Sequence, residues 1–203
     1  GAAGVMLTDR DARKGDAAIA DVLASGAEAA FVQADLRDES APSQIFEAAL
    51  ARFKRVDGLV NAAGMTDRAS LTDATPELWG AVFAVKARAP FFLMQALERH
   101  LRETRNPGAA VNILSMNIYG GTADLAVYSA SKAALAIATK SAAHAHRFDR
   151  MRVNGINLGW AETPAEHQMQ AVTLKRGAAW RDEAAAKLPF GRLIQPDDVA
   201  RLA

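Results

Sequence analysis

Short apolar runs alternate along the chain with longer stretches in which apolar residues recur at helical spacing. Buried strands are predicted at residues 4–9, 29–34, 56–60, 110–114 and 151–158, and helices at 12–24, 43–53, 76–104 and 125–148. The strands are apolar at nearly every position, which is typical of a parallel sheet covered on both faces. The pattern therefore predicts an α/β fold, a doubly wound parallel sheet in three α/β/α layers, as one domain over residues 1–203.

Composition narrows the class of protein. The chain has 24 basic and 23 acidic residues, so it offers no broad charged field for nucleic acid or an acidic lipid surface. It has no cysteine, which excludes disulfides, cysteine-based zinc sites and a thiol nucleophile. Its apolar runs are shorter than the roughly 20 residues that cross a bilayer. We expect a cytoplasmic protein that binds a small molecule, with no nucleic-acid or membrane partner.

Small, acidic and hydroxyl residues follow the predicted strands, at the edge where parallel sheets bind ligands. These residues are Asp9, Asp35, Asn61 to Gly64, Ser115 and Gly159 to Thr163. A carboxylate after a strand can accept hydrogen bonds from both ribose hydroxyls of a nucleotide, although a turn-capping role is an equal alternative. The small residues before and at Gly64 allow a flat ligand to approach closely.

Three of the residues at this edge form a candidate catalytic group. Tyr128 and Lys132 are four residues apart on a predicted helix, so their side chains lie on one face. Ser115 ends the preceding strand, where the start of that helix can pack beside it.

Several segments together resemble the short-chain dehydrogenase/reductase family, in order and at its spacing over essentially the whole chain. They are Asn61-Ala62-Ala63-Gly64, Ser115, Tyr128-Ser129-Ala130-Ser131-Lys132 and Asn157-Leu158-Gly159-Trp160-Ala161-Glu162-Thr163. The resemblance implies a Rossmann-like fold and an oxidoreductase that transfers a hydride between NAD(P) and a secondary alcohol or carbonyl.

By this resemblance, Tyr128 is the acid/base and Ser115 holds the substrate oxygen. A phenol has a pKa near 10, so activity at neutral pH requires a drop of about 3 pKa units. One positive charge at ~4 Å and an effective dielectric of ~20 supplies about that much, and Lys132 is placed to provide it. Tyr119 has Ala123 four residues later and does not fit this role; we expect it to line the pocket or pack.

The resemblance also implies a set of cofactor-binding residues. They are Asp9, Arg10, Asp35, Leu36, Asn61, Ala62, Ala63, Gly64, Tyr128, Lys132, Gly159, Ala161 and Thr163. Asp35 and Leu36 would lie against the adenine, and Thr163 near the nicotinamide amide. The Asp9 carboxylate favours NAD because it repels a 2′-phosphate, whereas Arg10 could pair with that phosphate and accept NADP. NAD is the prediction, with NADP as the alternative.

The chain departs from the family pattern at three places. The family's first strand, with its glycine-rich loop, and its last strand are missing from this sequence. We expect them to belong to segments of a longer protein that this sequence omits. Lys86 stands where the family has an asparagine that holds a water beside the active-site lysine. Lys86 either faces Lys132, where the pKa of one of the two lysines would fall, or turns outward to solvent. Leu158 replaces a proline before Gly159 and changes loop stiffness more than chemistry.

The sequence also leads to expectations about assembly, an alternative function, metal binding and the substrate. The family pairs two helices across subunits, so a homodimer or homotetramer is expected. The apolar stripe of Phe83 and Phe91 to Met94 is expected to form helix core and subunit interface. A catalytically weakened binding or scaffold subunit is the alternative function, whereas a methyltransferase would leave Ser115, Tyr128 and Lys132 unexplained. The four histidines predict no metal site. The polar residues Asn117, Tyr119, Glu162 and His167 suggest a polar, polyol-like substrate.

Overall fold

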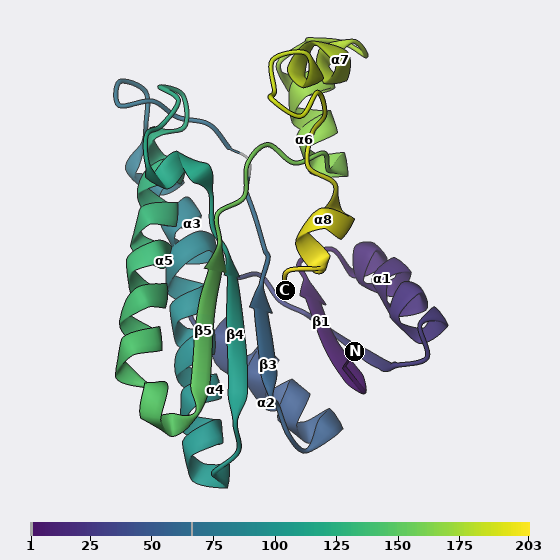
Figure 1. The fold of residues 1–203 in the computed structure, drawn as a ribbon, viewed down its shortest axis with the longest axis vertical. Coiled ribbons are helices and arrows are strands. Elements are labelled where there is room, and N and C mark those ends of the chain that lie inside the picture. The colour runs from purple at the N-terminus through teal and green to yellow at the C-terminus, as the bar shows by residue number, and fades with distance from the viewer. Residues whose placement is uncertain (1, 66) are drawn as a thin grey trace.

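The computed structural model describes residues 2–65 and 67–203, which form two parallel sheets. β1 (Gly4–Asp9) pairs with β2 (Glu28–Gln33) along its whole length. β3 (Gly58–Asn61), β4 (Gly108–Ile113) and β5 (Met151–Ile156) form the second sheet in that order, with β4 in the centre. Figure 1 shows the β1–β2 sheet on the β3 side of the second sheet and set apart from it, and within the described residues no strand pairing joins the two sheets.

Five longer helices connect and cover these strands. They are α1 (Ala12–Ala24), α2 (Ala41–Phe53), α3 (Pro76–Phe83), α4 (Ala89–Thr104) and α5 (Ala126–Ala145). α1 packs against β1 and β2, whereas α2, α4 and α5 lie on the other side of the strands (Figure 1). The predicted three-layer, doubly wound fold is confirmed. Among the described residues, no helix is both long and apolar enough to cross a membrane.

The largest core cluster lies between α4, α5 and the central strands. Leu97, Leu101 and Leu135 are fully buried there and pack around Ala110 of β4. Each buried leucine contributes on the order of 2 kcal/mol. A second cluster joins the two sheets, because Val32 of β2 and Leu59 of β3 both pack against it.

The C-terminal part forms a smaller unit above the carboxyl ends of the strands (Figure 1). It contains α6 (Pro164–His167), a π-helical turn over Gln168–Thr173, α7 (Trp180–Ala185) and α8 (Pro196–Ala200). Trp180 is completely buried in its own cluster with Ala184 and Leu193. This unit borders the edge of the sheet at which a ligand is expected.

The predicted elements occur close to their predicted places, with one informative difference. The helix expected over 76–104 is interrupted by a π-helical turn at Ala84–Arg88, where the Ala89 N–H donates to the Ala84 carbonyl five residues back. Pro90 explains the interruption, because it has no N–H for the Lys86 carbonyl and its ring crowds that oxygen. Lys86 lies in this widened turn and is buried.

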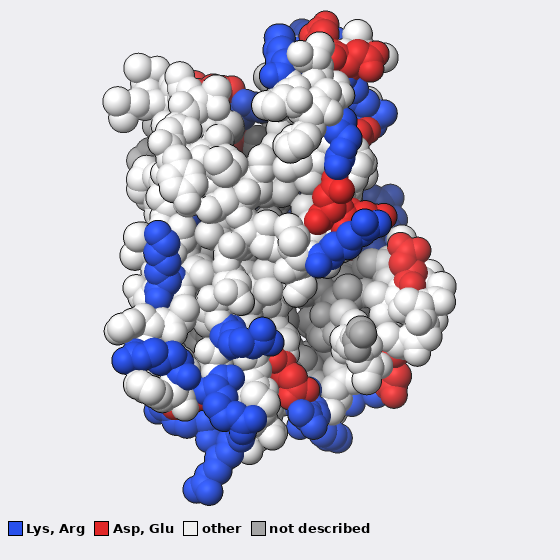
Figure 2. All heavy atoms as spheres, in the orientation of Figure 1, with Lys and Arg blue, Asp and Glu red and all other residues white. Residues whose placement is uncertain are grey.

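Charge is unevenly spread over the face shown in Figure 2. Lys and Arg side chains gather at the lower end, where α4 and α5 terminate, and the upper left part of this face is largely uncharged.

Short 3₁₀ turns at Met116–Ile118 and Arg147–Asp149 complete the described elements.

A buried polar chain links β3, β4 and α5 beneath the ligand edge. The Asn61 amide donates to Asn112 Oδ1 at 2.8 Å, and the Asn112 amide donates to Thr139 Oγ1 at 2.8 Å. Asn112 is fully buried. Since buried polar groups are costly unless paired, this chain fixes the register of three elements that carry the site.

We predict that Asn112→Ala lowers the free energy of unfolding by about 3 kcal/mol, because it strands the Asn61 amide and leaves a cavity. Denaturant unfolding measures the change. Asn154→Ala, an exposed asparagine on the neighbouring β5, serves as the control and should change it by less than about 0.5 kcal/mol. Equal effects of the two substitutions would contradict the role of the buried chain.

Candidate active site

The three predicted catalytic residues meet at the carboxyl end of β4. Ser115 lies two residues after β4 and is 7% exposed, while Tyr128 and Lys132 occupy the first turns of α5. The Lys132 ammonium, 5% exposed, donates a hydrogen bond to the Ile113 carbonyl and so ties α5 to the last residue of β4. The Ser115 hydroxyl interacts with the phenol of Tyr128. The structure therefore brings together the residues that the sequence spacing singled out.

The electrostatics of Tyr128 differ from the expectation. Burial raises the pKa of Tyr128 above its usual value near 10, and the negative charge of Glu166 raises it further. The hydrogen bond with Ser115 lowers this pKa without reversing the shift. The expected drop of about 3 pKa units is therefore wrong for the protein alone, because burial raises this pKa more than the Ser115 hydrogen bond lowers it, and the Lys132 ammonium is directed at the Ile113 carbonyl.

Two buried lysines share this region. Burial lowers the pKa of Lys132 to about 7, and the like charge of Lys86 lowers it further. Burial also lowers the pKa of Lys86 to about 8, with Asp67 acting in the opposite direction. The inward alternative for Lys86, with its effect on Lys132, is confirmed, and the outward alternative is wrong.

A polar cluster on the C-terminal side faces the same phenol. Glu166 of α6 accepts hydrogen bonds from Trp160 Nε1 at 2.9 Å and Gln170 Nε2 at 2.7 Å. Arg68 Nη1 lies 2.6 Å from Asp124 and its Nη2 lies 4.0 Å from Glu166. Glu166 and Arg68 were not predicted, because only the fold brings these two residues together. The one local signal was Thr163 followed by Pro164, which marks the start of a helix.

Three of the polar residues that were expected to contact the substrate make an ion pair or hydrogen bonds within the protein. Glu162 pairs with Arg181 at 2.8 Å, and His167 Nδ1 accepts a hydrogen bond from Trp180 Nε1 at 3.0 Å. Tyr119 is exposed, and its hydroxyl accepts a hydrogen bond from the Asn157 amide at 3.1 Å. The expectation that Tyr119 packs is therefore wrong.

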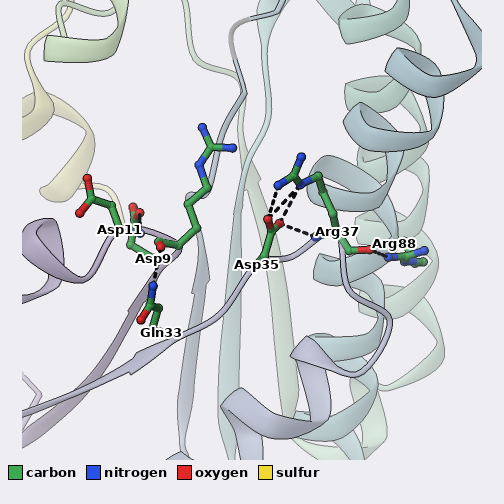
Figure 3. Close-up of polar contacts among 7 residues, drawn as sticks. Asp9, Asp11, Gln33, Asp35, Arg37 and Arg88 are labelled. Carbon is green, nitrogen blue, oxygen red and sulfur yellow. Dashed lines mark hydrogen bonds and ion pairs between the residues drawn. The ribbon is translucent and has the colours of Figure 1, made fainter.

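The other ligand-edge residues lie at the ends of β1 and β2 (Figure 3). Asp9 Oδ1 accepts the Asp11 N–H at 2.8 Å, so Asp9 performs the turn-capping role that the sequence left open. Gln33 donates from its amide to the Arg10 carbonyl at 2.9 Å and holds the backbone after β1. Arg10 itself is exposed. A carboxylate and an exposed guanidinium are therefore adjacent where a ribose is expected.

Asp35 is engaged within the protein. Arg37 Nε lies 3.0 and 2.9 Å from its two oxygens, and this pairing lowers the pKa of Asp35 to about 2. Arg88 in turn donates to the Arg37 carbonyl at 2.5 Å (Figure 3). Leu36 packs against the cluster that joins the two sheets.

The two small-residue loops frame the site from either side. Ala62, Ala63 and Gly64 are exposed after β3, and a Cβ at Gly64 would lie 3.3 Å from Lys86 Nζ. Ala161 forms a bridge with Ile194, and a Cβ at Gly159 would lie 3.1 Å from the same isoleucine. Thr163 accepts the Glu166 N–H and caps α6. An open small-residue loop and a terminal carboxylate fit a nucleotide as ligand.

One cluster lies at the opposite end of the sheet. Ligand atoms of Glu98, His146 and Asp149 are within 4.8 Å of one another, which the sequence did not predict. Arg102 Nη2 lies 2.6 Å from the Glu98 carboxylate and neutralises it, so this group is an ion-pair cluster in the described structure.

Comparison with known proteins agrees with this geometry. The family model described as Enoyl-(Acyl carrier protein) reductase matches residues 1–203. The short-chain dehydrogenase/reductase FrzI of Cladobotryum sp is 34% identical over 179 residues, covering 87% of this chain and 68% of that protein. Galactitol 2-dehydrogenase of Agrobacterium fabrum is 31% identical over 205 residues, covering 98% of this chain and 78% of that protein.

A solved structure gives the same fold. The gluconate 5-dehydrogenase of Burkholderia cenocepacia J2315, in complex with NADP and tartrate, superposes with a TM-score of 0.84 at 27% identity. The superposition covers 100% of this chain and 76% of the other. With a family model matched over its whole length and relatives above 30% identity, the chain belongs to the short-chain dehydrogenases/reductases, a family of NAD(P)-dependent oxidoreductases.

Proposed function

We propose that this chain transfers a hydride between a nicotinamide cofactor and a secondary alcohol or carbonyl, with Tyr128 as the acid/base. The observation that carries the proposal is the convergence of Ser115, Tyr128 and Lys132 at the carboxyl end of β4. The bound nicotinamide supplies or accepts the hydride. The chain's own residues then have to hold the substrate oxygen and move its proton.

Each of the three residues has a distinct task in this proposal. The Ser115 hydroxyl hydrogen-bonds the substrate oxygen and stabilises the charge that develops on it. The Tyr128 phenol donates a proton to that oxygen during carbonyl reduction and removes it during alcohol oxidation. Lys132, held by the Ile113 carbonyl, fixes the distance between α5 and β4 and contributes positive charge.

The state of Tyr128 bears on the direction of the reaction. Because burial raises the pKa of Tyr128, the phenol is protonated at neutral pH. This is the form that donates a proton, so it is ready for reduction of a carbonyl. Oxidation of an alcohol needs the phenolate, which the hydrogen bond with Ser115 favours and which positive charge close to the ring or its hydroxyl can stabilise further.

NAD is the proposed cofactor, with NADP as the alternative. The Asp9 carboxylate at the end of β1 can accept a hydrogen bond from a ribose hydroxyl and repels a 2′-phosphate. The exposed guanidinium of Arg10 is the feature that favours NADP. The related gluconate 5-dehydrogenase was solved with NADP, so the question needs a direct test.

The proposed substrate is a small polar molecule. Glu166 lies close enough to Tyr128 to raise the pKa of its phenol, and it is held by Trp160 and Gln170. A carboxylate so placed can accept a hydrogen bond from a second hydroxyl of the substrate. The names of two relatives, a galactitol and a gluconate dehydrogenase, support a polyol or sugar acid.

The proposed assembly is a homodimer or homotetramer. Phe91 and Phe92 are about half exposed on α4, and Ile137 is 62% exposed on α5. Exposed aromatic and aliphatic side chains on two neighbouring helices are typical of a subunit interface.

Replacing Tyr128 by Phe removes the proton that the mechanism requires. We predict that Tyr128→Phe lowers kcat by about 10²- to 10⁴-fold for a panel of secondary alcohols and polyols. The measurement is NADH formation, with binding of NAD by fluorescence as the check that the site is intact. Unchanged turnover would overturn the proposed mechanism, whereas retained NAD binding without turnover in the unaltered protein would favour a binding or scaffold subunit.

Replacing Asp9 by Ser tests the cofactor. We predict that Asp9→Ser weakens NAD binding by roughly 10- to 100-fold, because a hydrogen bond to a charged group is lost. NADP binding should be unchanged or stronger. Asp11→Ser, which removes a neighbouring carboxylate that accepts the Arg13 N–H, is the control. Weaker NADP binding in Asp9→Ser would contradict the assignment.

Introducing charge on α4 tests the assembly. Phe91→Asp is expected to reduce the molar mass measured by light scattering to that of a single chain, since the carboxylate would be buried between subunits. Phe148→Asp alters a phenylalanine that is 83% exposed after α5, and should leave the mass unchanged. An oligomer that survives Phe91→Asp places the interface elsewhere.

A further inference from the structure

Lys86 is a buried cation that the proposed mechanism does not use. Its side chain is 4% exposed, and its Nζ lies 4.9 Å from the centroid of the Tyr128 ring. The π-helical turn that Pro90 imposes at Ala84–Arg88 carries this lysine. Gly64 packs against the other side, because a Cβ there would lie 3.3 Å from Nζ. The ammonium is thus held between the small-residue loop after β3 and the aromatic ring.

A cation over the face of an aromatic ring interacts with the π electrons. Loss of the phenol proton adds negative charge, and part of that charge is delocalised into the ring. The attraction to a cation 4.9 Å from the centroid is therefore stronger for the phenolate than for the phenol. Lys86 can discriminate between the two protonation states of Tyr128 without touching its hydroxyl.

The other charged groups around this pair act in known directions. Lys132 of α5 carries a like charge, and the presence of Lys86 lowers the pKa of Lys132. Asp67, in the segment after β3, favours the charged form of Lys86. Glu166 of α6 disfavours the phenolate of Tyr128. Of these three groups, Lys132 is the one whose charge also favours the phenolate, and its hydrogen bond is directed to the Ile113 carbonyl.

We propose that Lys86 is a positioning residue whose ammonium, held over the ring face of Tyr128 by the π-helical turn, stabilises the phenolate from the side of the ring. The inference rests on the proposed function of Tyr128 as the acid/base. It assigns to Lys86 the activation that the sequence analysis assigned to Lys132. Proton loss from Tyr128 is then coupled to the protonation of Lys86, so the two groups titrate as a pair.

The chain has two tyrosines, which allows a direct test. In a Tyr119→Phe background, the ultraviolet absorbance of phenolate reports Tyr128 alone. The pKa of Lys86 is about 8, so its charge acts on Tyr128 only near and below that pH. Lys86→Met in that background is therefore expected to remove the fraction of phenolate that the unaltered protein forms near pH 8, and to leave the ionisation of Tyr128 at higher pH in place. Lys140→Met, which removes an exposed lysine on the same helix as Tyr128, is the matched control and should leave the titration in place.

Two further variants keep the test decisive. Lys86→Gln retains a polar side chain and should also remove this fraction of phenolate, which covers the case in which Lys86→Met does not fold by circular dichroism. Lys86→Arg keeps the charge and should restore the unaltered titration or move it to lower pH. A Tyr128 titration that is the same in the Met, Gln and unaltered proteins would overturn the proposal.

Failure of the proposal for Lys86 can be distinguished from failure of the proposed function of Tyr128. The titration needs no substrate or cofactor, so it reports the effect of Lys86 on Tyr128 whatever the reaction. If Tyr128→Phe keeps full turnover while Lys86→Met still shifts the phenolate, the acid/base role fails and the electrostatic coupling holds. If Tyr128→Phe abolishes turnover and Lys86→Met leaves the phenolate in place, the role of Tyr128 holds and that of Lys86 fails.

Discussion

Two lysine ammonium groups and one phenol share a buried space at the carboxyl end of β4, and the properties of the site follow from that crowding. Burial alone disfavours every charge there, which explains the raised pKa of Tyr128 and the lowered pKa values of Lys86 and Lys132. The backbone compensates for part of this cost, because the Ile113 carbonyl accepts a hydrogen bond from Lys132. The Tyr128 ring provides the matching contact for Lys86. Each group therefore depends on the position of the other two.

The fold serves this site by fixing β3, β4 and α5 relative to one another. The buried chain from Asn61 through Asn112 to Thr139 sets their register beneath the ligand edge. The apolar cluster that contains the buried leucines of α4 and α5 packs behind it. Such a division, with a rigid scaffold below and polar groups at the strand ends, is the usual arrangement in open α/β sheets.

Most of the fold could be predicted from the sequence, because its signals are local. The apolar run at 4–9 and the helical spacing at 12–24 agree with β1 and α1 at both ends. The start of β4 was placed two residues late, since Gly108 has no apolar side chain. Its backbone nevertheless pairs with Arg150, and a Cβ there would lie 2.4 Å from Leu101. The π-helical turn was missed, because a single proline within a long apolar helix gave no sign of which carbonyl it would release.

The residues that meet at the site could be predicted from the sequence, but the proton affinity of Tyr128 could not. The spacing of Ser115, Tyr128 and Lys132 was enough to bring them together, since one strand end and one helix face determine their positions. Glu166 and Arg68 come from distant segments, and no local pattern joins them. The proton affinity of Tyr128 could not be read from its spacing to Lys132, because burial and the direction of the Lys132 hydrogen bond decide it.

The central claim is that burial keeps Tyr128 protonated until positive charge over its ring or near its hydroxyl compensates. Carbon-13 NMR of protein labelled at tyrosine Cζ observes this group directly, with Tyr119 as the exposed reference in the same spectrum. In the ligand-free protein, Tyr128 is expected to give the resonance of a phenol at neutral pH and to ionise above the usual tyrosine pKa of about 10. A Tyr128 resonance at the phenolate position at neutral pH would contradict it.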